Sequence, residues 1–213
     1  MRKCLRGCRL IVTAEAAVRQ ALRRVLAAVA TDGPEVVDEF WVPRSHERAD
    51  VAAIGDVIEA FEIKTDQDSL RRLPRQVAAY GRVFDRCTAV VAERHVRETM
   101  RMAPTWWGVL VITIGDAISF ETARSPGINE TVDADTLVRL LWRDEVTAAL
   151  TALNAPPEPG TARSSMWDEL IERVDLDGLR TIVRQALRGR DPSRARFATR
   201  RFSSAVITGA TGL

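Results

Sequence analysis

The stretch "RADVAAIGDVIEAFEIK", Arg48 to Lys64, decides how the first part of this chain folds. It contains two apolar runs of strand length separated by Gly-Asp, a dipeptide that marks a tight turn between neighbouring strands. Because side chains alternate between the faces of a strand, Glu62 and Lys64 project from one side. Phe61 and Ile63 then point into the core from the other side. The stretch predicts a hairpin with charge on one face and apolar side chains on the other.

Lys64 is an unusual residue in this chain. Of the 31 basic residues, only Lys3 and Lys64 are lysine. Lysine offers a compact ammonium whose pKa responds to its surroundings, whereas arginine is a broad fork that stays charged. We therefore expect a position that needs an ammonium beside the carboxylate of Glu62. An exposed Glu62–Lys64 pair at a strand edge is the alternative.

The register of the hairpin decides whether a second carboxylate joins Glu62. A two-residue turn would set Ala49 opposite Glu62 and turn Asp50 away. A three-residue loop, or one bulge, pairs Ile54 with Ile58 and sets Asp50 opposite Glu62. The second register separates apolar from charged residues better, and it is the one we predict.

Two carboxylates held against each other repel, and their pKa values rise unless a cation neutralises them. Ligands that are all oxygen favour a hard divalent ion, Mg²⁺ with Mn²⁺ as a substitute. A metal-bound water is more acidic than a free one, and the metal also polarises a phosphoryl oxygen. Lys64 beside such a site would stabilise the attacking hydroxide and the charge that builds on phosphorus.

Hydrophobic periodicity and turn residues predict an α/β chain whose second part is helical. The second helix is expected to be capped by Asp68, and the last by Asp175 or Asp177. Helices are expected over residues 13–30, 69–84, 94–102, 133–153, 164–174 and 176–187, and strands over 36–42, 49–54, 57–64, 87–92, 106–114 and 117–122.

This order of elements, with Asp on the second strand and Glu-x-Lys on the third, resembles the PD-(D/E)xK nuclease superfamily. The resemblance implies a restriction-endonuclease-like core, α-β-β-β-α-β, with a mixed sheet flanked by helices and a C-terminal helical extension. The superfamily's leading proline is replaced by Ala49. Glu39 matches an upstream acidic residue that contacts the metal or its water. Asp38 competes for that role, but it would face oppositely in a strand.

The helix after Glu-x-Lys carries "QVAAY", Gln76 to Tyr80. It is similar to the Gln-x-x-x-Tyr element of RecB-type nuclease domains. The resemblance implies that Gln76 lines the active site and that Tyr80 is a supporting or DNA-facing residue. Together with "ERADVAAI", "PTWWGVLVI" and "LLWRDE", these motifs resemble a small family of stand-alone bacterial proteins assigned to this nuclease fold. The resemblance covers Glu35 to Arg190.

The implied function is a Mg²⁺-dependent nuclease that hydrolyses DNA phosphodiester bonds. Its endo or exo action and its role, whether DNA repair or phage defence, stay open. A non-catalytic nucleic-acid-binding module and an interaction subunit of a larger machine are the alternatives. The expected metal ligands are Asp50, Glu62 and Glu39, and the expected catalytic residues add Lys64 and Gln76. The expected DNA contacts are Arg48, Arg71, Arg72, Arg75 and Tyr80, although the helix arginines are equally compatible with a solvated face.

Composition sets the remaining expectations. We expect a nuclease-like core over residues 1–130, a helical extension packed on it over 131–190, and a loosely ordered basic tail over 191–213. Seven arginines against one aspartate between Arg184 and Arg201 suit a polyanion, or equally a solvated tail. Three cysteines form no disulfide framework, and the apolar run at residues 10–12 is too short for a signal peptide.

We therefore expect a cytoplasmic protein that binds no membrane. A protein partner on the C-terminal helices and a homodimer both stay open. Trp106 and Trp107 stand at the entrance to a strand, and we expect them in the core, with one of them at a partner surface as an alternative. Base stacking on an exposed tryptophan is a further alternative.

Overall fold

The computed structural model describes residues 14–28 and 33–190, and it shows an α/β protein with a six-stranded mixed sheet flanked by helices. The chain divides into two compact units, Met1–Leu137 and Val138–Leu213. The boundary lies slightly beyond the expected split near residue 130. The expected tail over 191–213 lies outside the described residues.

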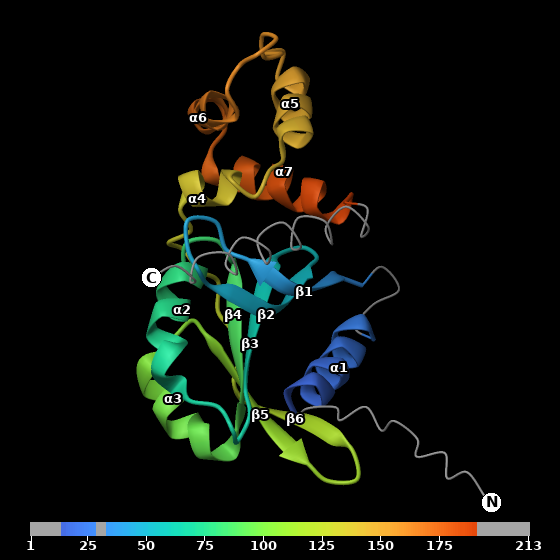
Figure 1. Ribbon diagram of the computed structural model, residues 1–213, viewed down its shortest axis with the longest axis vertical. Helices are drawn as coiled ribbons and strands as arrows, with labels where there is room; N and C mark the ends of the chain where they lie inside the picture. The colour runs from blue at the N-terminus through green and yellow to red at the C-terminus, as the bar shows by residue number, and fades with distance from the viewer. Residues whose placement is uncertain (1–13, 29–32, 191–213) are drawn as a thin grey trace, which may run out of the picture. The chain divides into compact units, whose positions relative to one another are not determined.

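The sheet keeps its strands in sequence order, from β1 at one edge to β6 at the other (Figure 1). The first three strands are antiparallel, β3, β4 and β5 are parallel, and β6 returns antiparallel to β5. The six predicted strands are confirmed to within two residues at each end. Their bounds are β1 Glu35–Trp41, β2 Arg48–Ile54, β3 Ile58–Lys64, β4 Arg86–Ala92, β5 Gly108–Ile114 and β6 Ile118–Arg124.

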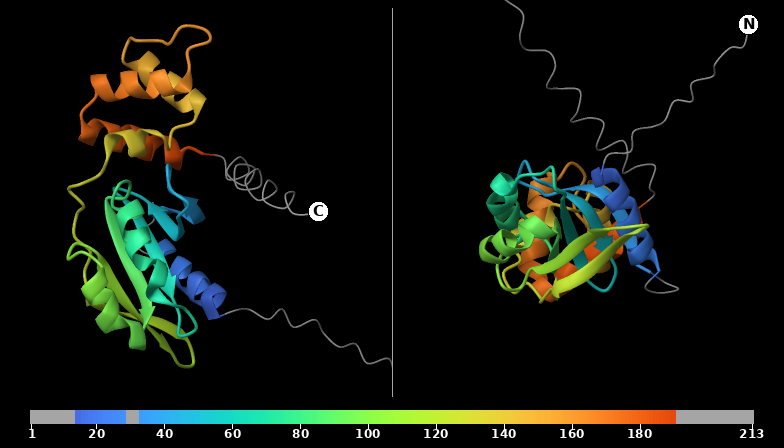
Figure 2. Two further views of the ribbon diagram at one scale, coloured as in Figure 1. Left: turned by 60° about the vertical axis from the view of Figure 1, so that its left-hand side comes forward. Right: turned by 90° about the horizontal axis from the view of Figure 1, so that it is seen from below.

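Helices cover both faces of this sheet. Figures 1 and 2 show α1 (Ala14–Ala27) on one face, with α2 (Leu73–Tyr80) and α3 (Val96–Met102) on the other. Helix α1 buries Val18 and Leu22 against a cluster of strand side chains. That cluster comprises Val51, Ala53, Phe61, Ile63, Val90 and Ile112. The apolar stripe of α1 therefore fixes this helix beneath the strands that carry the candidate site.

The β2–β3 hairpin has the predicted register. Ile54 pairs with Ile58, and Val51 pairs with Phe61. The amide of Gly55 donates to the carbonyl of Val57 at 3.0 Å, which closes a three-residue loop. The apolar side chains of both strands face the core. The pattern of apolar and charged residues therefore predicted the correct one of the two possible registers.

The second helix is shorter than predicted, and its expected cap was wrong. A 3₁₀ turn, η1 (Leu70–Arg72), precedes α2, and Ser69 caps that turn by accepting from the amide of Arg71. The carboxylate of Asp68 instead accepts from the amide and hydroxyl of Thr65. The helix ends at Gly81. There the side-chain amide of Asn129 donates hydrogen bonds to the carbonyl oxygens of Gly81 and Phe84. The helix therefore ends before Phe84, the last apolar residue of the predicted stripe, and the hydrogen bonds from the distant Asn129 hold the chain in this non-helical path.

The single helix predicted over 133–153 is two helices, α4 (Ala134–Val138) and α5 (Arg143–Ala152). Trp142 has an extended backbone, and its amide donates to the carboxylate of Glu145 at 2.7 Å. Arg190 donates to the carbonyl of Leu140 and pairs with the carboxylate of Glu145. It therefore supplies a hydrogen bond to a carbonyl between α4 and α5 that no longer has a helical partner.

Two more helices lie in the described part of the second unit, α6 (Arg163–Arg173) and α7 (Leu176–Arg188). Asp175 caps α7 by accepting from the amide of Gly178 at 2.9 Å, so the first of the two candidate caps is confirmed. The short η2 turn (Glu93–His95) leads into α3 in the first unit. Among the described residues, no helix is both long and apolar enough to cross a bilayer.

Candidate functional site

Glu62 lies at the centre of a buried network on the α2 side of the sheet. One carboxylate oxygen accepts from the ammonium of Lys64 and from the amide of Gln76, both at 2.5 Å. The other lies 2.6 Å from the hydroxyl of Tyr80. Glu62 is 1% exposed and Lys64 is 3% exposed. A carboxylate has about four acceptor positions, so three donors leave it room for one more ligand.

Helix α2 supplies two of these donors because Gln76 and Tyr80 lie one turn apart on its inner face. The Tyr80 ring stacks on Trp107 with centroids 5.9 Å apart and meets Phe84 edge-on at 5.4 Å. Burial first, and the nearby charge of Glu62 second, raise the pKa of Tyr80 far above its usual value. Tyr80 is fully buried, so it supports Glu62 and does not face a nucleic acid. This corrects its assignment as a DNA-contacting residue.

Asp50 occupies the position on β2 where regular pairing with β3 ends. Beyond the Val51–Phe61 pair, the amide of Ile63 donates to the Asp50 carboxylate at 2.7 Å. Burial and the negative charge of Glu62 raise the pKa of Asp50 to about 7, against the opposing effects of the Ile63 amide and Lys64. The two carboxylates therefore conflict electrostatically, as the predicted register requires.

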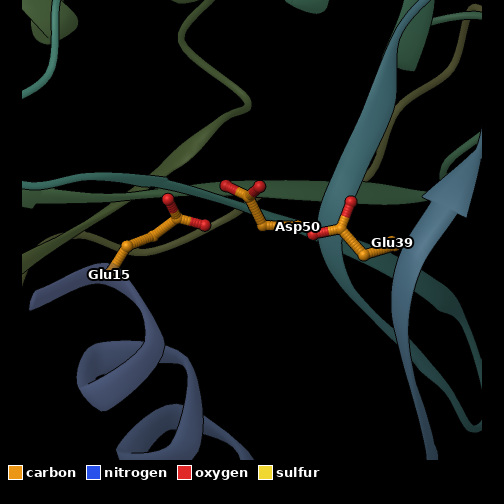
Figure 3. A group of neighbouring side chains, drawn as sticks. All are labelled: Glu15, Glu39 and Asp50. Atoms are coloured by element: carbon orange, nitrogen blue, oxygen red, sulfur yellow. The ribbon is translucent and has the colours of Figure 1, made fainter. Parts of the chain in front are cut away.

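Asp50 also belongs to a second group of acids, the acidic trio, which consists of Glu15, Glu39 and Asp50. One oxygen from each lies within 4.8 Å of the others. Figure 3 shows Asp50 between Glu15 of α1 and Glu39 of β1, with the three carboxylates turned toward one another. Three oxygen ligands at this spacing are a suitable arrangement for a hard divalent cation.

Glu39 reaches the trio through an uncommon backbone conformation. Its φ of 57° is in the left-handed region, which costs a residue other than glycine about 1–3 kcal/mol. Pairing with β2 continues on either side of it, through Asp38–Val51 and Phe40–Ala49. Glu39 therefore stands opposite Asp50 without a regular ladder pair between them.

The positive φ also breaks the alternation that we expected to separate Asp38 from Glu39. Asp38 pairs with Arg23 of α1 at 2.7 Å, and Glu39 pairs with Arg19 of the same helix at 2.5 Å. Both acids therefore reach α1, and the expectation that they face oppositely was wrong. Strand alternation holds only while the backbone stays extended.

Two arginines neutralise the acidic trio. The Arg19 guanidinium lies 2.5 Å from Glu39, 2.6 Å from Glu15 and 3.6 Å from Asp50. Arg48 forms a further ion pair with Glu39. A positive charge therefore already lies where a metal ion would bind the trio. The Nε of Arg19 is buried and has no hydrogen-bond partner within the described residues.

Gln76 contains an unsatisfied acceptor beside Glu62. Its Nε2 donates to Glu62, while its Oε1 is buried and accepts no hydrogen bond from any described residue. A buried acceptor without a donor costs about 1–3 kcal/mol. A water or a hydrated cation held at Glu62 would supply that donor, which makes this atom an independent indication of a ligand.

The expected DNA-contacting arginines all lie on the surface. Arg71, Arg72 and Arg75 are exposed at the start of α2, next to Gln76 in the chain. Arg75 forms a long ion pair with Glu47 at 3.3 Å. Arg48 is half-exposed beside Glu39. The structure thus brings together Glu39, Asp50, Glu62, Lys64 and Gln76 within the first unit.

Sequence reasoning missed Glu15 and Arg19. An acidic residue in the first turn of a helix is accounted for by the helix dipole alone, so the sequence indicates no further role for Glu15, and Arg19 carries no motif. A helical period shows which residues of α1 face the core, but it does not show which strand they meet. The signal that was present is the position of both residues next to the buried stripe of Val18 and Leu22.

Three comparisons with known proteins bear on this chain. A family model described as "Bacteriophage P4 protein cII" matches residues 12–208. Protein cII of Enterobacteria phage P4 is 33% identical over 75 residues, which cover 35% of this chain and 28% of that protein. The SPO1766 protein of unknown function from Silicibacter pomeroyi shares 23% identity over 67% of this chain and 92% of its own. The TM-score of this comparison is 0.40.

Proposed function

The chain belongs to the family of bacteriophage P4 protein cII, and we propose that it is a Mg²⁺-dependent nuclease that hydrolyses DNA phosphodiester bonds. The proposal comes from the site and not from the family's name. It includes the finer fold assignment, a restriction-endonuclease-like core formed by α1, β1, β2, β3, α2 and β4. Their order agrees with the α-β-β-β-α-β order of that core.

One observation supports the proposal: Asp50 is partly buried beside Glu62, and burial and the negative charge of Glu62 disfavour its ionised form despite the nearby Lys64. Burial and the charge of Glu62 raise the pKa of Asp50 to about 7. Holding two carboxylates close together in the folded protein costs free energy, and a divalent cation bound between them would remove their repulsion. Proteins tolerate such conflicts mainly at functional sites.

The residues present fit a hard cation. The acidic trio offers oxygen atoms within 4.8 Å of one another, and Glu62 keeps one acceptor position. The unsatisfied Oε1 of Gln76 would accept a hydrogen bond from a water of the hydrated ion. When bound, Mg²⁺ would supply an acidified water and polarise a phosphoryl oxygen.

The chain's own side chains would do the remaining work. Lys64 would stabilise the charge that builds on the phosphate, and Gln76 would hold Glu62 in position. Arg19 would have to leave the trio when the cation enters, and its long side chain would allow that movement. The exposed arginines Arg48, Arg71, Arg72 and Arg75 would bind phosphates on either side of the cleaved bond.

A nucleic-acid-binding protein without catalysis is the second candidate, and Arg19 is the observation that favours it. Its guanidinium already pairs with Glu15 and Glu39 and lies near Asp50. If this arrangement is permanent, the trio needs no metal, and the same surface would bind nucleic acid through its arginines alone.

A plasmid-nicking assay separates the two candidates. We expect the wild-type protein to cut in Mg²⁺ or Mn²⁺ and not in EDTA. Asp50→Asn and Lys64→Met should each lower the rate roughly 100- to 1,000-fold. Glu98→Gln, at an exposed acid of α3 paired with Arg101, is the matched control and should cut like wild type. Binding without cutting in either metal would reject the nuclease and favour the second candidate.

A further inference from the structure

His95 is a buried histidine that the proposed chemistry does not use. It is the last residue of the η2 turn, which directly follows β4, and it is 8% exposed. Its Nε2 lies 3.2 Å from the backbone carbonyl oxygen of Thr65. Because a carbonyl oxygen can only accept, Nε2 carries the hydrogen and His95 donates this bond. Thr65 follows Lys64, the last residue of β3, so the bond ties the end of the strand that carries the candidate site to the η2 turn.

Thr65 is hydrogen-bonded through each of its polar groups. Its amide and its hydroxyl donate to the carboxylate of Asp68 at 2.8 and 2.6 Å. Its carbonyl accepts from the amide of Asp68 at 3.1 Å as well as from His95. Asp68 belongs to the same loop, so its bonds define the shape of the loop. His95 comes from a different part of the chain, so its bond defines where the loop lies relative to η2.

Arg94 adds a second attachment between the same two segments. Its guanidinium donates to the backbone carbonyl oxygens of Asp66 and Asp68. The side chain of Arg94 is 53% exposed, whereas His95 is buried, so water replaces the bonds of Arg94 more easily than the bond of His95. We call the bonds that Arg94 and His95 donate to residues 65–68 the loop clamp.

The loop clamp begins where the regular pairing of β3 ends. Lys64 pairs with Val91 of β4, and this is the last pair of that ladder. The end of a ladder frays most easily unless other contacts hold it. The ammonium of Lys64 lies 2.5 Å from Glu62 in the buried network, and in such a site a displacement of about 1 Å can lower a rate roughly 100-fold.

We propose that His95 is a positioning residue that holds the backbone beyond Lys64 and thereby keeps the ammonium beside Glu62. His95 acts through Thr65 and has no direct part in the chemistry. This inference rests on the proposed nuclease function for the catalytic role of Lys64. The position of Lys64 itself can be measured without any cleavage.

The composition of the chain makes that measurement specific. Lys3 and Lys64 are the only lysines, so the full-length protein made with ¹³C-labelled lysine gives two sets of lysine signals in an NMR spectrum. Lys64→Met identifies the set that belongs to Lys64. We expect His95→Phe, which keeps a ring but loses the donor, to shift the Lys64 side-chain signals in EDTA. His95→Gln, whose side-chain amide keeps an N–H donor, should leave them close to their wild-type positions.

Thr99→Val is the matched control. Thr99 is buried on α3, about one turn after His95, and its hydroxyl has no hydrogen-bond partner among the described residues. The substitution keeps the shape of the side chain and should leave the Lys64 signals unchanged. Arg94→Met removes the exposed half of the loop clamp and should shift the Lys64 signals by less than His95→Phe. Because Arg94 lies on the surface, this variant also tests the clamp if His95→Phe does not fold.

Cleavage supplies a second readout. In the plasmid-nicking assay, His95→Phe should lower kcat roughly 10- to 100-fold and leave KM for DNA within about twofold. The reason is that Lys64 would act on the transition state, whereas the proposed DNA contacts lie elsewhere. His95→Gln should restore kcat to within about threefold of wild type.

The outcomes separate the two proposals. Wild-type protein that cuts no DNA in Mg²⁺ or Mn²⁺ would reject the proposed function, while the lysine signals would still show whether His95 holds Lys64. Lys64 signals that stay in place in both His95→Phe and Arg94→Met would overturn the inference. An equal shift in His95→Gln or in Thr99→Val would also overturn it, because the shift would then not follow the bond to Thr65.

Discussion

Glu62 and the acidic trio hold negative charge in two different ways. Glu62 is sealed in the core, where an ammonium, an amide and a hydroxyl surround its two oxygens. The trio is only half-buried, and its partners are the long side chains of Arg19 and Arg48. The donors around Glu62 are all buried, whereas the side chains of Arg19 and Arg48 are 18% and 46% exposed, so a cation would displace a guanidinium more readily than it would a donor of Glu62.

Because of this difference, we expect the Glu62 network and the acidic trio to have different roles. The Glu62 network is rigid and would fix the position of Lys64 and of any ligand beside it. The trio is adjustable and would be the place where a metal enters and leaves. Asp50 belongs to both groups, since Glu62 raises its pKa while Arg19 lies 3.6 Å away. A change of charge at the acidic trio would therefore act on the Glu62 network through the electrostatic interaction of Asp50 with Glu62.

The largest predicted effect concerns stability and distinguishes Glu62 from Glu39. Glu62→Ala leaves the charge of Lys64 buried without its partner, which should lower the free energy of unfolding by about 3–5 kcal/mol. Glu39→Ala removes a half-exposed acid and should cost at most about 1 kcal/mol. Urea unfolding measures both. Equal effects would show that the two sites do not differ in rigidity.

A double variant checks the cause of that effect. Removing Lys64 as well, in Glu62→Ala/Lys64→Ala, eliminates the uncompensated charge, so the loss should be smaller than the sum of the two single losses. A loss equal to the sum would mean that packing, not the buried charge pair, explains the cost of changing Glu62.

The second prediction concerns pH and the metal-free protein. Because the folded state raises the pKa of Asp50 to about 7, the folded protein holds a proton there that the unfolded chain releases near pH 4. The contribution of Asp50 to the free energy of unfolding should therefore be largest at and below about pH 4, fall as the pH rises toward 7, and level off above it. The expected fall is roughly 2–4 kcal/mol.

Urea unfolding in EDTA across this pH range measures the effect. Asp50→Asn cannot ionise and should flatten the curve between pH 4 and 7. Asp38→Asn is the matched control, because that acid is exposed and paired with Arg23, and it should keep the wild-type slope. A slope that persists in Asp50→Asn would place the titrating group elsewhere.

The sequence predicted the strands and the hairpin register because both follow from local patterning. Separating apolar from charged side chains leaves a single acceptable pairing, and Val51 meets Phe61 as that pairing requires. The same pattern placed Glu62 and Lys64 on one face. The resemblance placed Gln76 in the site, but the contacts of Gln76 and Tyr80 with Glu62 come from the structure, since strand and helix spacing alone do not show which helix meets which strand.

The missed features depend on contacts between distant segments. The helix predicted over 133–153 breaks where Arg190, far along the chain, binds the Leu140 carbonyl and Glu145. The φ of 57° at Glu39 has no glycine or asparagine to signal it. Glu15 and Arg19 join the site only because α1 packs Val18 and Leu22 under β2 and β3, and periodicity does not specify that partner.

The smallest predicted effect tests whether Arg19 is exchangeable. Arg19 pairs with Glu15 and Glu39, so it would compete directly with a cation for the trio. Arg19→Gln should therefore tighten Mn²⁺ binding, measured by calorimetry, by about fivefold to tenfold, which corresponds to about 1–1.4 kcal/mol.

Arg23→Gln is the control for Arg19→Gln because it lies one turn further along α1 and pairs with Asp38, outside the trio. It lowers the net charge by the same amount, so an equal gain in Mn²⁺ affinity would show only a general effect of charge. If Arg19→Gln instead leaves Mn²⁺ affinity unchanged and lowers the unfolding free energy, Arg19 is a permanent counter-ion. The trio would then be a structural ion-pair network, and the binding candidate would stand in place of the nuclease.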